Sequence, residues 1–356
     1  MADVLATRAC SLLGCRYPIV QTGMGWVSGA NLTAATSAAG GFGILAAVTM
    51  DMGQLERAIA GVKAATDAPF GVNLRPDQPD LAARVELLAT EGVRLASFAG
   101  APSKATIDRL HDAGILVMPT VGARRHAEKM LGWGVDIVIA QGGEGGGHTG
   151  PVPTTLLLPD VCDAVGADIP VLAAGGFHDG RGLVAALAYG ADGVAMGTRF
   201  LLSAESRVPD EVKQRYLAAK VTDTVVTEAL DGAPQRVIRT ELVDRLIRSS
   251  AVTRLPRAVG NALAFRKVTG TSVKDLASEG LAMRKSQDLT LSQLAMAANA
   301  PMLIKAALVD GDPEVGVLPT GQVTGLIDSL PPVAEIVESI VADARATLTR
   351  LAGSDI

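Results

Sequence analysis

The chain has 356 residues, 48% hydrophobic and 19% charged, which predicts a large packed core in one α/β domain with an appendage, or in two domains. The aromatic content of 3% and the net charge of −5 argue against base stacking and phosphate-backbone binding, so no nucleic-acid partner is expected. No apolar run reaches the roughly 18 residues of a membrane span and no secretory signal is evident, so a cytoplasmic protein without a membrane partner is predicted. The three widely spaced cysteines fit reduced thiols, and no histidine or cysteine cluster predicts a metal site.

Short apolar runs alternate with helical stretches over the first 202 residues. Eight runs are predicted to be strands: Pro18–Met24, Phe42–Val48, Phe70–Leu74, Arg94–Gly100, Leu116–Gly122, Ile137–Gly143, Pro170–Gly176 and Gly193–Leu201. Most are continuously apolar rather than alternating, which is typical of parallel strands covered on both faces. Helical patterns are predicted between them: Asn31–Ala39, Gln54–Thr66, Ala82–Thr90, Ser103–Ala113, Ala123–Leu131 and Asp179–Tyr189. The repeats predict a (β/α)8 TIM barrel over residues 1–202, with a doubly wound sheet as the alternative.

The pattern changes after Leu202, and residues 203–356 are predicted to form a helical appendage over the barrel mouth. Its helices are expected at Asp210–Ala219, Thr240–Arg248, Leu289–Ala300 and Val333–Leu351. Residues 239–285 carry ten Lys and Arg against four acids. Such a run is either a solvated helical face or a surface for a polyanion such as coenzyme A, for which Arg254 and Arg257 are the candidate residues.

One loop stands out because it combines many glycines with a single histidine. Residues 141–150 follow a buried strand and contain six glycines together with His148. Glycine allows positive φ and lets the main chain approach a ligand closely. Pro151 and Pro153 follow where a Rossmann fold would begin a helix, so the loop is not a dinucleotide fingerprint. It is either a solvated linker or a site with an imidazole at its centre.

The ends of the other strands indicate a phosphate-bearing cofactor. In a (β/α)8 barrel the site lies at the carboxyl ends of the strands, and the loops after the last two often bind phosphate. Gly175-Gly176 and Gly197-Thr198 have the glycine-rich composition needed at those two places. FMN, pyridoxal phosphate and a sugar phosphate all suit such a clamp. None of the predicted strands contains the lysine that pyridoxal phosphate needs, and the amides of Asn73 and Gln141 are available for a flavin ring.

Several of these segments together resemble a known family. They are Gln21-x-Gly23-Met24, Gly71-Val72-Asn73, Gln141-x-x-Glu144-x-Gly146-Gly147-His148-x-Gly150, Ala174-Gly175-Gly176, Gly197-Thr198-Arg199-Phe200 and, late in the chain, Gly321-Gln322. The sequence is similar to the nitronate monooxygenase / 2-nitropropane dioxygenase family of FMN-dependent barrels, which includes enoyl-thioester reductases. The resemblance implies that His148 is catalytic. It also implies cofactor contacts at Gly23, Met24, Asn73, Gln141, Gly146, Gly147, Ala174, Gly175, Gly176, Gly197, Thr198 and Gln322.

Within that family the chain is most similar to enzymes of bacterial steroid degradation. The likeness implies an enzyme that introduces a double bond into a bicyclic acyl-CoA, with NAD(H) as the expected co-substrate. Where nitronate monooxygenases usually have Ala-Pro-Met, this chain has Thr22-Gly23-Met24. Nitronate monooxygenase, enoyl-thioester reductase and a non-catalytic flavin-binding protein remain the alternatives, and a homo-oligomer is left open.

Overall fold

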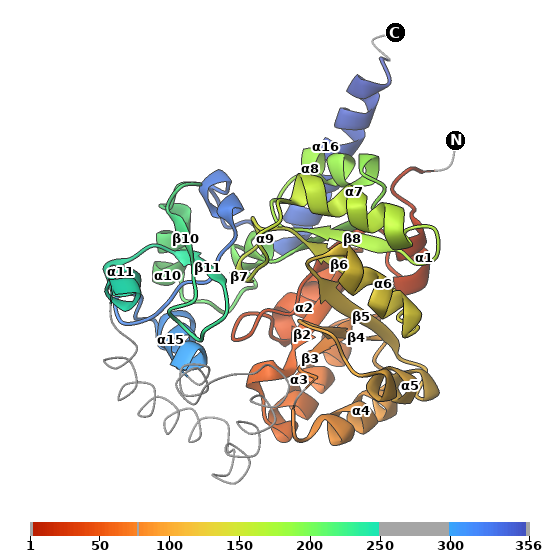
Figure 1. Cartoon of the computed structure of the whole chain (residues 1–356), viewed down its shortest axis with the longest axis horizontal. Coiled ribbons are helices and arrows are strands. Elements are labelled where there is room, and N and C mark those ends of the chain that lie inside the picture. The colour runs from red at the N-terminus through yellow and green to blue at the C-terminus, as the bar shows by residue number, and fades with distance from the viewer. Residues whose placement is uncertain (1–2, 77, 249–298, 354–356) are drawn as a thin grey trace.

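The computed structural model describes residues 3–76, 78–248 and 299–353, and its centre is a closed parallel barrel (Figure 1). The strand order around the barrel is β1-β2-β3-β4-β5-β6-β8-β9, with each neighbouring pair parallel. The strands are β1 (Ile19–Gln21), β2 (Phe42–Ala46), β3 (Gly71–Leu74), β4 (Leu95–Phe98), β5 (Leu116–Val121), β6 (Val138–Gln141), β8 (Val171–Ala174) and β9 (Gly193–Met196). The predicted (β/α)8 barrel and all eight of its strands are confirmed.

Helices cover the outside of the barrel. They are α2 (Ala30–Ala38), α3 (Met52–Ala65), α4 (Leu81–Thr90), α5 (Lys104–Asp112), α6 (Arg124–Gly132), α7 (Thr154–Val165) and α8 (Gly180–Ala188), with the 3₁₀ turn η1 (Ala47–Thr49) after β2. Helix α7 was not predicted, because it contains Pro159 and follows the glycine loop. The last predicted strand was too long, since residues Thr198–Leu201 form the short helix α9 after β9.

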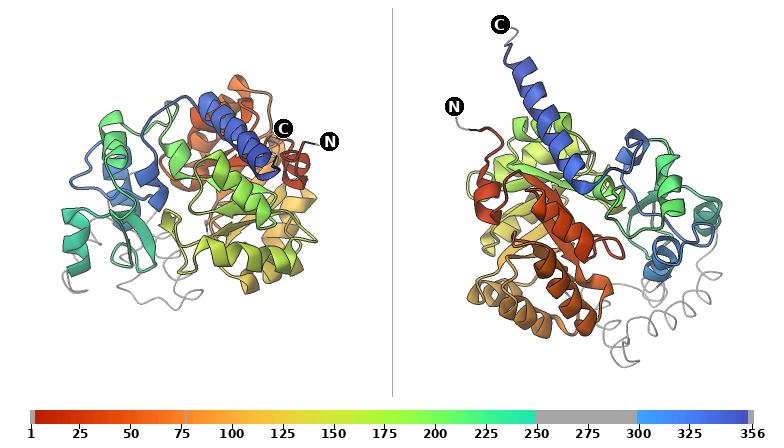
Figure 2. Two further views of the ribbon diagram at one scale, coloured as in Figure 1. Left: turned by 90° about the horizontal axis from the view of Figure 1, so that it is seen from above. Right: turned by 180° about the vertical axis from the view of Figure 1, so that it is seen from behind.

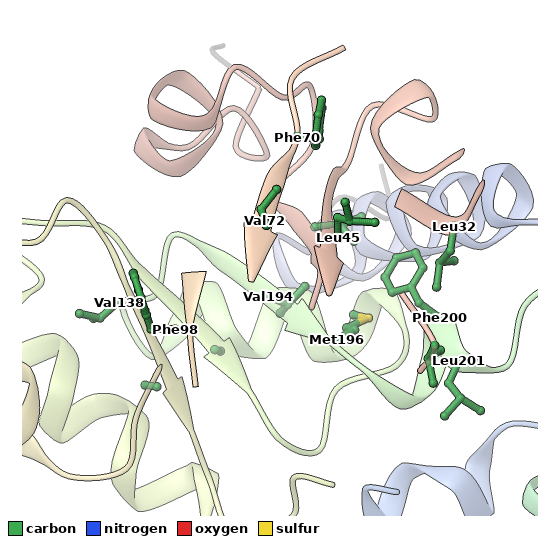
Figure 3. Close-up of a cluster of buried hydrophobic side chains, with 14 of the residues drawn as sticks. Leu32, Leu45, Phe70, Val72, Phe98, Val138, Val194, Met196, Phe200 and Leu201 are labelled. Carbon is green, nitrogen blue, oxygen red and sulfur yellow. The ribbon is translucent and has the colours of Figure 1, made fainter. Parts of the chain in front are cut away.

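Apolar side chains fill both faces of the barrel wall. One cluster lies inside the barrel and includes Val20, Ile44 and Leu172 from three of its strands. A larger cluster lies between strands and outer helices, and Figure 3 shows part of it, including Leu45 and Val72. Residues on both faces of a strand are therefore buried, which is why the strands read as unbroken apolar runs.

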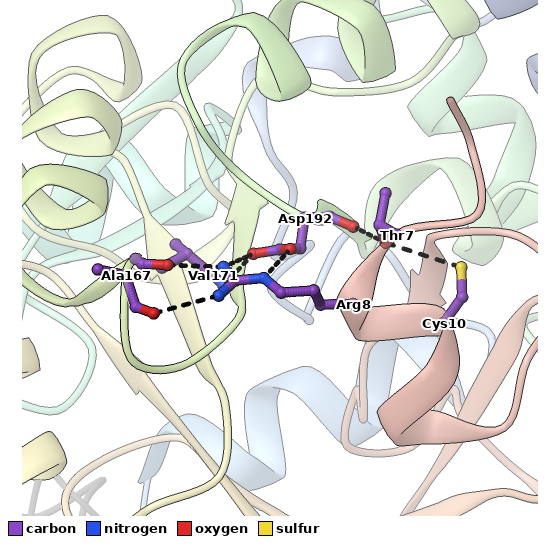
Figure 4. Close-up of polar contacts among 7 residues, drawn as sticks. Thr7, Arg8, Cys10, Ala167, Val171 and Asp192 are labelled. Atoms are coloured by element: carbon purple, nitrogen blue, oxygen red, sulfur yellow. Dashed lines mark hydrogen bonds and ion pairs between the residues drawn. The ribbon is translucent and has the colours of Figure 1, made fainter. Parts of the chain in front are cut away.

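The N-terminal helix α1 (Arg8–Leu13) packs on the amino-terminal end of the barrel, opposite the glycine loop. Figure 4 shows that the Arg8 guanidinium pairs with the Asp192 carboxylate, with Nη2 and Oδ2 2.9 Å apart. Asp192 Oδ2 also accepts a hydrogen bond of 3.1 Å from the Val171 main-chain N–H. This network ties the start of the chain to β8 and to the residue before β9.

The C-terminal part contains strands as well as helices. Its elements are α10 (Asp210–Leu217), β10 (Thr224–Thr227), β11 (Gln235–Ile238), α11 (Glu241–Arg248), α15 (Asn299–Leu308), η2 (Gln322–Leu326) and α16 (Val333–Leu351). Helices were expected throughout this region, and the two four-residue strands differ from that expectation. Helix α16 packs against α8 and α2 on the barrel wall, not over the mouth (Figure 2). Among the described helices, none is long and apolar enough to cross a membrane.

Candidate active site

The glycine loop after β6 is held in place by a strand from the C-terminal part of the chain. Its residues Gly147–His148 form the short strand β7, which pairs antiparallel with β11. In this register Gln235 lies opposite His148 and Arg236 lies opposite Gly147. Strand β10 pairs with the other edge of β11 and completes a three-stranded sheet. The predicted catalytic histidine is therefore fixed by strand pairing rather than by the barrel alone.

An acidic side chain contacts the His148 imidazole. The Asp231 carboxylate Oδ2 lies 2.9 Å from His148 Nε2, and the amide of Gln235 is hydrogen-bonded to the same oxygen. Gln235 Nε2 is also 3.2 Å from His148 Nε2. The Asp231 side chain is 10% exposed, whereas that of His148 is 63% exposed. Because a carboxylate only accepts hydrogen bonds, the His148–Asp231 contact places a proton on Nε2, and the Gln235 amide then donates to the carboxylate and not to the ring. In the neutral imidazole the Nδ1 lone pair is left free.

Three further contacts fix the main chain of the loop. The Arg236 guanidinium donates from Nη2 to the Gly143 carbonyl oxygen at 2.8 Å. The Gln141 side-chain amide donates to the His148 carbonyl oxygen at 2.7 Å, and the Gln322 N–H donates to the Glu144 carbonyl oxygen at 3.0 Å. Burial lowers the pKa of Arg236, and the Glu144 carboxylate partly offsets that shift. Gln141 of the barrel, Arg236 of the β10–β11 hairpin and Gln322 near the C-terminus therefore all hydrogen-bond to the main chain of the same ten-residue loop.

Glycine backbones, not side chains, form the surface beside this loop. A Cβ atom on Gly146 would lie 2.4 Å from the Thr320 carbonyl carbon, so only glycine fits there. Gly175 has a φ of +89°, and its added Cβ would lie 2.8 Å from the Gly142 carbonyl oxygen. Next to it, Gly176 has a φ of +87° and no atom within 3.8 Å of its added Cβ. Close packing at Gly146 and Gly175, and positive φ at Gly175 and Gly176, require glycine here, and such a glycine-rich turn fits the phosphate end of a cofactor such as FMN.

The remaining predicted cofactor residues contact one another at the same end of the barrel. Gly23 packs directly on Asn73, since an added Cβ would lie 2.4 Å from the Asn73 Cβ. The Met24 sulfur would be 3.4 Å from a Cβ on Gly197. Thr198 Oγ1 accepts a hydrogen bond of 3.0 Å from the Gly321 N–H, and so joins the loop after β9 to the segment before Gln322.

The amide side chains of Asn73 and Gln141 have one end already bonded within the protein. Asn73 donates its Nδ2 to the Ser97 hydroxyl at 3.1 Å, and Gln141 donates to the loop as described above. Both donations leave the side-chain carbonyl oxygens available to the N–H groups of a ligand. This geometry fits the polar edge of an isoalloxazine ring.

The structure thus brings the sequence-predicted barrel and loop residues together at one end of the barrel, with Ala174 at the end of β8. Arg254 and Arg257 lie outside the described residues. Sequence reasoning missed Asp231, Gln235 and Arg236. A signal was present, because Asp231-Gly232 and Pro234 separate two short runs, one of them rich in valine and threonine, as in a β-hairpin.

Comparison with known proteins agrees with this geometry. The family model for nitronate monooxygenase matches residues 7–84 and 82–343. A Mycobacterium tuberculosis protein named (3aS,4S,5R,7aS)-5-hydroxy-7a-methyl-1-oxo-octahydro-1H-indene-4-carboxyl-CoA dehydrogenase is 57% identical over 341 residues, 96% of each chain. The Rhodococcus jostii protein of the same name is 56% identical over 96% of each chain. Among solved structures, FabK from Thermotoga maritima has a TM-score of 0.78 at 35% identity, covering 98% of both chains. The chain therefore belongs to the nitronate monooxygenase family of flavin-dependent oxidoreductases.

Proposed function

We propose that this chain is an FMN-dependent acyl-CoA dehydrogenase acting on the bicyclic steroid-derived substrate, 5-hydroxy-7a-methyl-1-oxo-octahydroindene-4-carboxyl-CoA. The reaction introduces a carbon–carbon double bond α,β to the thioester. The observation that carries the proposal is the 57% identity, over 96% of each chain, to a protein named as the dehydrogenase of that compound. At such identity over the whole length, a shared substrate class is the simplest explanation.

The residues that would hold FMN come from five segments. The phosphate is assigned to the main chain at Gly175-Gly176 and Gly197-Thr198, where three of the four residues have no side chain. The ring is assigned to the space beside Met24, Asn73 and Gln141. When bound, FMN supplies the acceptor for the hydride that leaves the β carbon, and we infer that NAD accepts those electrons afterwards.

His148 is assigned as the base that removes the α proton. A proton next to a thioester is acidic enough for an imidazole near neutral pH. The Asp231 contact leaves Nδ1 of His148 as the free basic nitrogen, and β11 fixes the loop that carries it. Main-chain N–H groups of the glycine loop are assigned to the developing enolate oxygen, which forms as the proton leaves.

The test is anaerobic mixing of the flavin-loaded protein with the indene-carboxyl-CoA substrate while the visible flavin absorbance is followed. Bleaching supports the proposal. Bleaching by NADH or by a nitronate, but not by the acyl-CoA, would instead favour an enoyl-thioester reductase or a nitronate monooxygenase, the latter with oxygen uptake.

Replacement of His148 tests its assigned role separately. His148→Ala is expected to reduce the rate of bleaching by about 10²- to 10⁴-fold while flavin content is retained, because a general base is lost. His126→Ala is the matched control, since His126 is an exposed histidine on α6. Full activity of the His148 variant would remove that residue from the mechanism without touching the substrate assignment.

A further inference from the structure

A second pocket lies next to the barrel mouth, formed by the loops after β1 and β2, helix α3, the segment between α9 and α10, and the end of α15. Its volume is about 470 Å³. We call it the arginine pocket. The lining residues that matter here are Trp26, Met50, Arg57, Arg207, Leu308 and Val309.

The arginine pocket is cationic. Arg57 and Arg207 both line it, and no carboxylate is among its lining residues. Arg57 makes no hydrogen bond or ion pair within the described part of the chain. Arg207 donates from Nε to the Trp26 carbonyl oxygen at 2.8 Å and has no acidic partner there. Burial lowers the pKa of Arg207, yet a guanidinium stays protonated at neutral pH. Among the described residues, two positive charges therefore face one pocket that has no carboxylate in its lining.

Three of the residues that line the arginine pocket are apolar, and we call them its apolar side. They are Met50, Leu308 and Val309, and Val309 is 43% exposed. Trp26 also lines the pocket. Its φ is +66°, and it is the one non-glycine residue with positive φ in the described chain. A backbone strained in this way persists only when its surroundings fix it. Arg207 on the Trp26 carbonyl and Thr49 Oγ1, 3.4 Å from the Trp26 nitrogen, provide that support.

The position of the arginine pocket links it to the candidate active site. Trp26 follows Met24 by two residues, a span of at most about 7 Å along the chain. Met24 itself lies against Gly197, one of the residues assigned to FMN. A long substrate can therefore place one end in the arginine pocket and the other beside the flavin space.

We propose that the arginine pocket binds the 3′-phosphorylated ADP end of the acyl-CoA substrate. The inference rests on the proposed function, which supplies the acyl-CoA. Phosphate groups match the two guanidinium groups, because arginine forms paired hydrogen bonds with phosphate oxygens. The adenine matches the apolar side. The flexible pantetheine arm then leads from the pocket to the thioester beside His148.

Calorimetric titration with coenzyme A and with adenosine 3′,5′-bisphosphate tests the arginine pocket without requiring turnover. Arg57→Glu is the informative variant, because Arg57 is exposed and unpaired within the described residues, so we expect its replacement to leave the fold intact. We expect both ligands to bind about ten-fold more weakly, which corresponds to about 1.4 kcal/mol. Arg350→Glu makes the same charge change at an exposed residue in the last turn of α16 and should leave binding unchanged. Unchanged flavin content and melting temperature show that both variants are folded.

The kinetic counterpart compares the full substrate with its acyl-pantetheine fragment. Arg57→Glu should raise the KM for the acyl-CoA about ten-fold with little change in kcat, and should leave the KM for the fragment unchanged. Equal binding of both ligands by the wild type and Arg57→Glu, or no binding by the wild type, would overturn the inference. Arg57-dependent binding of coenzyme A without flavin bleaching by the acyl-CoA would retain the pocket and reject the proposed reaction.

Discussion

Replacing Asp231 by asparagine tests how His148 is made ready for its assigned role. The two side chains differ in charge but hardly in shape. The carboxylate accepts from Nε2 of His148 at 2.9 Å, and its side chain is 10% exposed. The asparagine amide can turn its N–H₂ group towards Nε2 and donate instead. The imidazole would then hold its proton on Nδ1, the nitrogen that must remain free to act as the base.

The expected loss of kcat follows from the hydrogen bond between Asp231 and His148. A hydrogen bond that involves a charged group contributes about 1.5–3 kcal/mol. Because the His148 side chain is 63% exposed, the lower end applies, which corresponds to at least about ten-fold in kcat. Inversion of the tautomer would add to that loss. The KM for the acyl-CoA should change little, since Asp231 is assigned no contact with the substrate.

The assay combines steady-state kinetics with ¹⁵N NMR of the imidazole. In the wild type the Nε2-protonated tautomer should dominate, and in Asp231→Asn the Nδ1-protonated form should appear. Asp168→Asn, which removes one exposed charge between α7 and β8 at the far end of the barrel, is the control. A wild-type kcat in Asp231→Asn, or an unchanged tautomer, would refute this account of how the histidine is positioned.

Two predictions concern stability. Gly180→Ala should destabilise the protein by about 2 kcal/mol or more, because the added Cβ would lie 2.2 Å from the Ala344 main-chain nitrogen where α8 meets α16; chemical denaturation measures it. Burial lowers the pKa of His178, so protonation of this imidazole opposes folding. The stability contributed by neutral His178 is complete above about pH 6.5 and is lost as the pH falls below that value. His178→Asn should lose less unfolding free energy than the wild type between pH 7.5 and 5.5, and an equal loss would contradict this.

The features that could be predicted from the sequence are those with a local pattern of residues. Most barrel strands are apolar runs with a glycine or proline nearby, so the fold could be predicted from short windows. The run through Phe200 and Leu201 was misassigned because apolar residues look alike in a buried strand and in a short buried helix. The glycine loop and the glycines after β8 and β9 were found because close backbone approach needs one residue type.

The partners of His148 carry no comparable local signal. Asp231 contacts a residue 83 positions earlier in the chain, and an isolated aspartate in a polar turn is ordinary. Strands β10 and β11 have four residues each, near the lower limit at which alternation can be recognised. Four expectations stay predictions: coenzyme A binding by Arg254 and Arg257, the domain boundary at residue 202, the oligomeric state and the cytoplasmic location.

The antiparallel pairing of β7 with β11 also bears on the order in which the protein is made. During synthesis all eight barrel strands are made before residues 235–238, and Gln322 comes later still. A chain that ends before residue 235 therefore contains every barrel strand and His148 but lacks the strand that pairs with the histidine loop. The segments that position His148 are completed only near the end of synthesis.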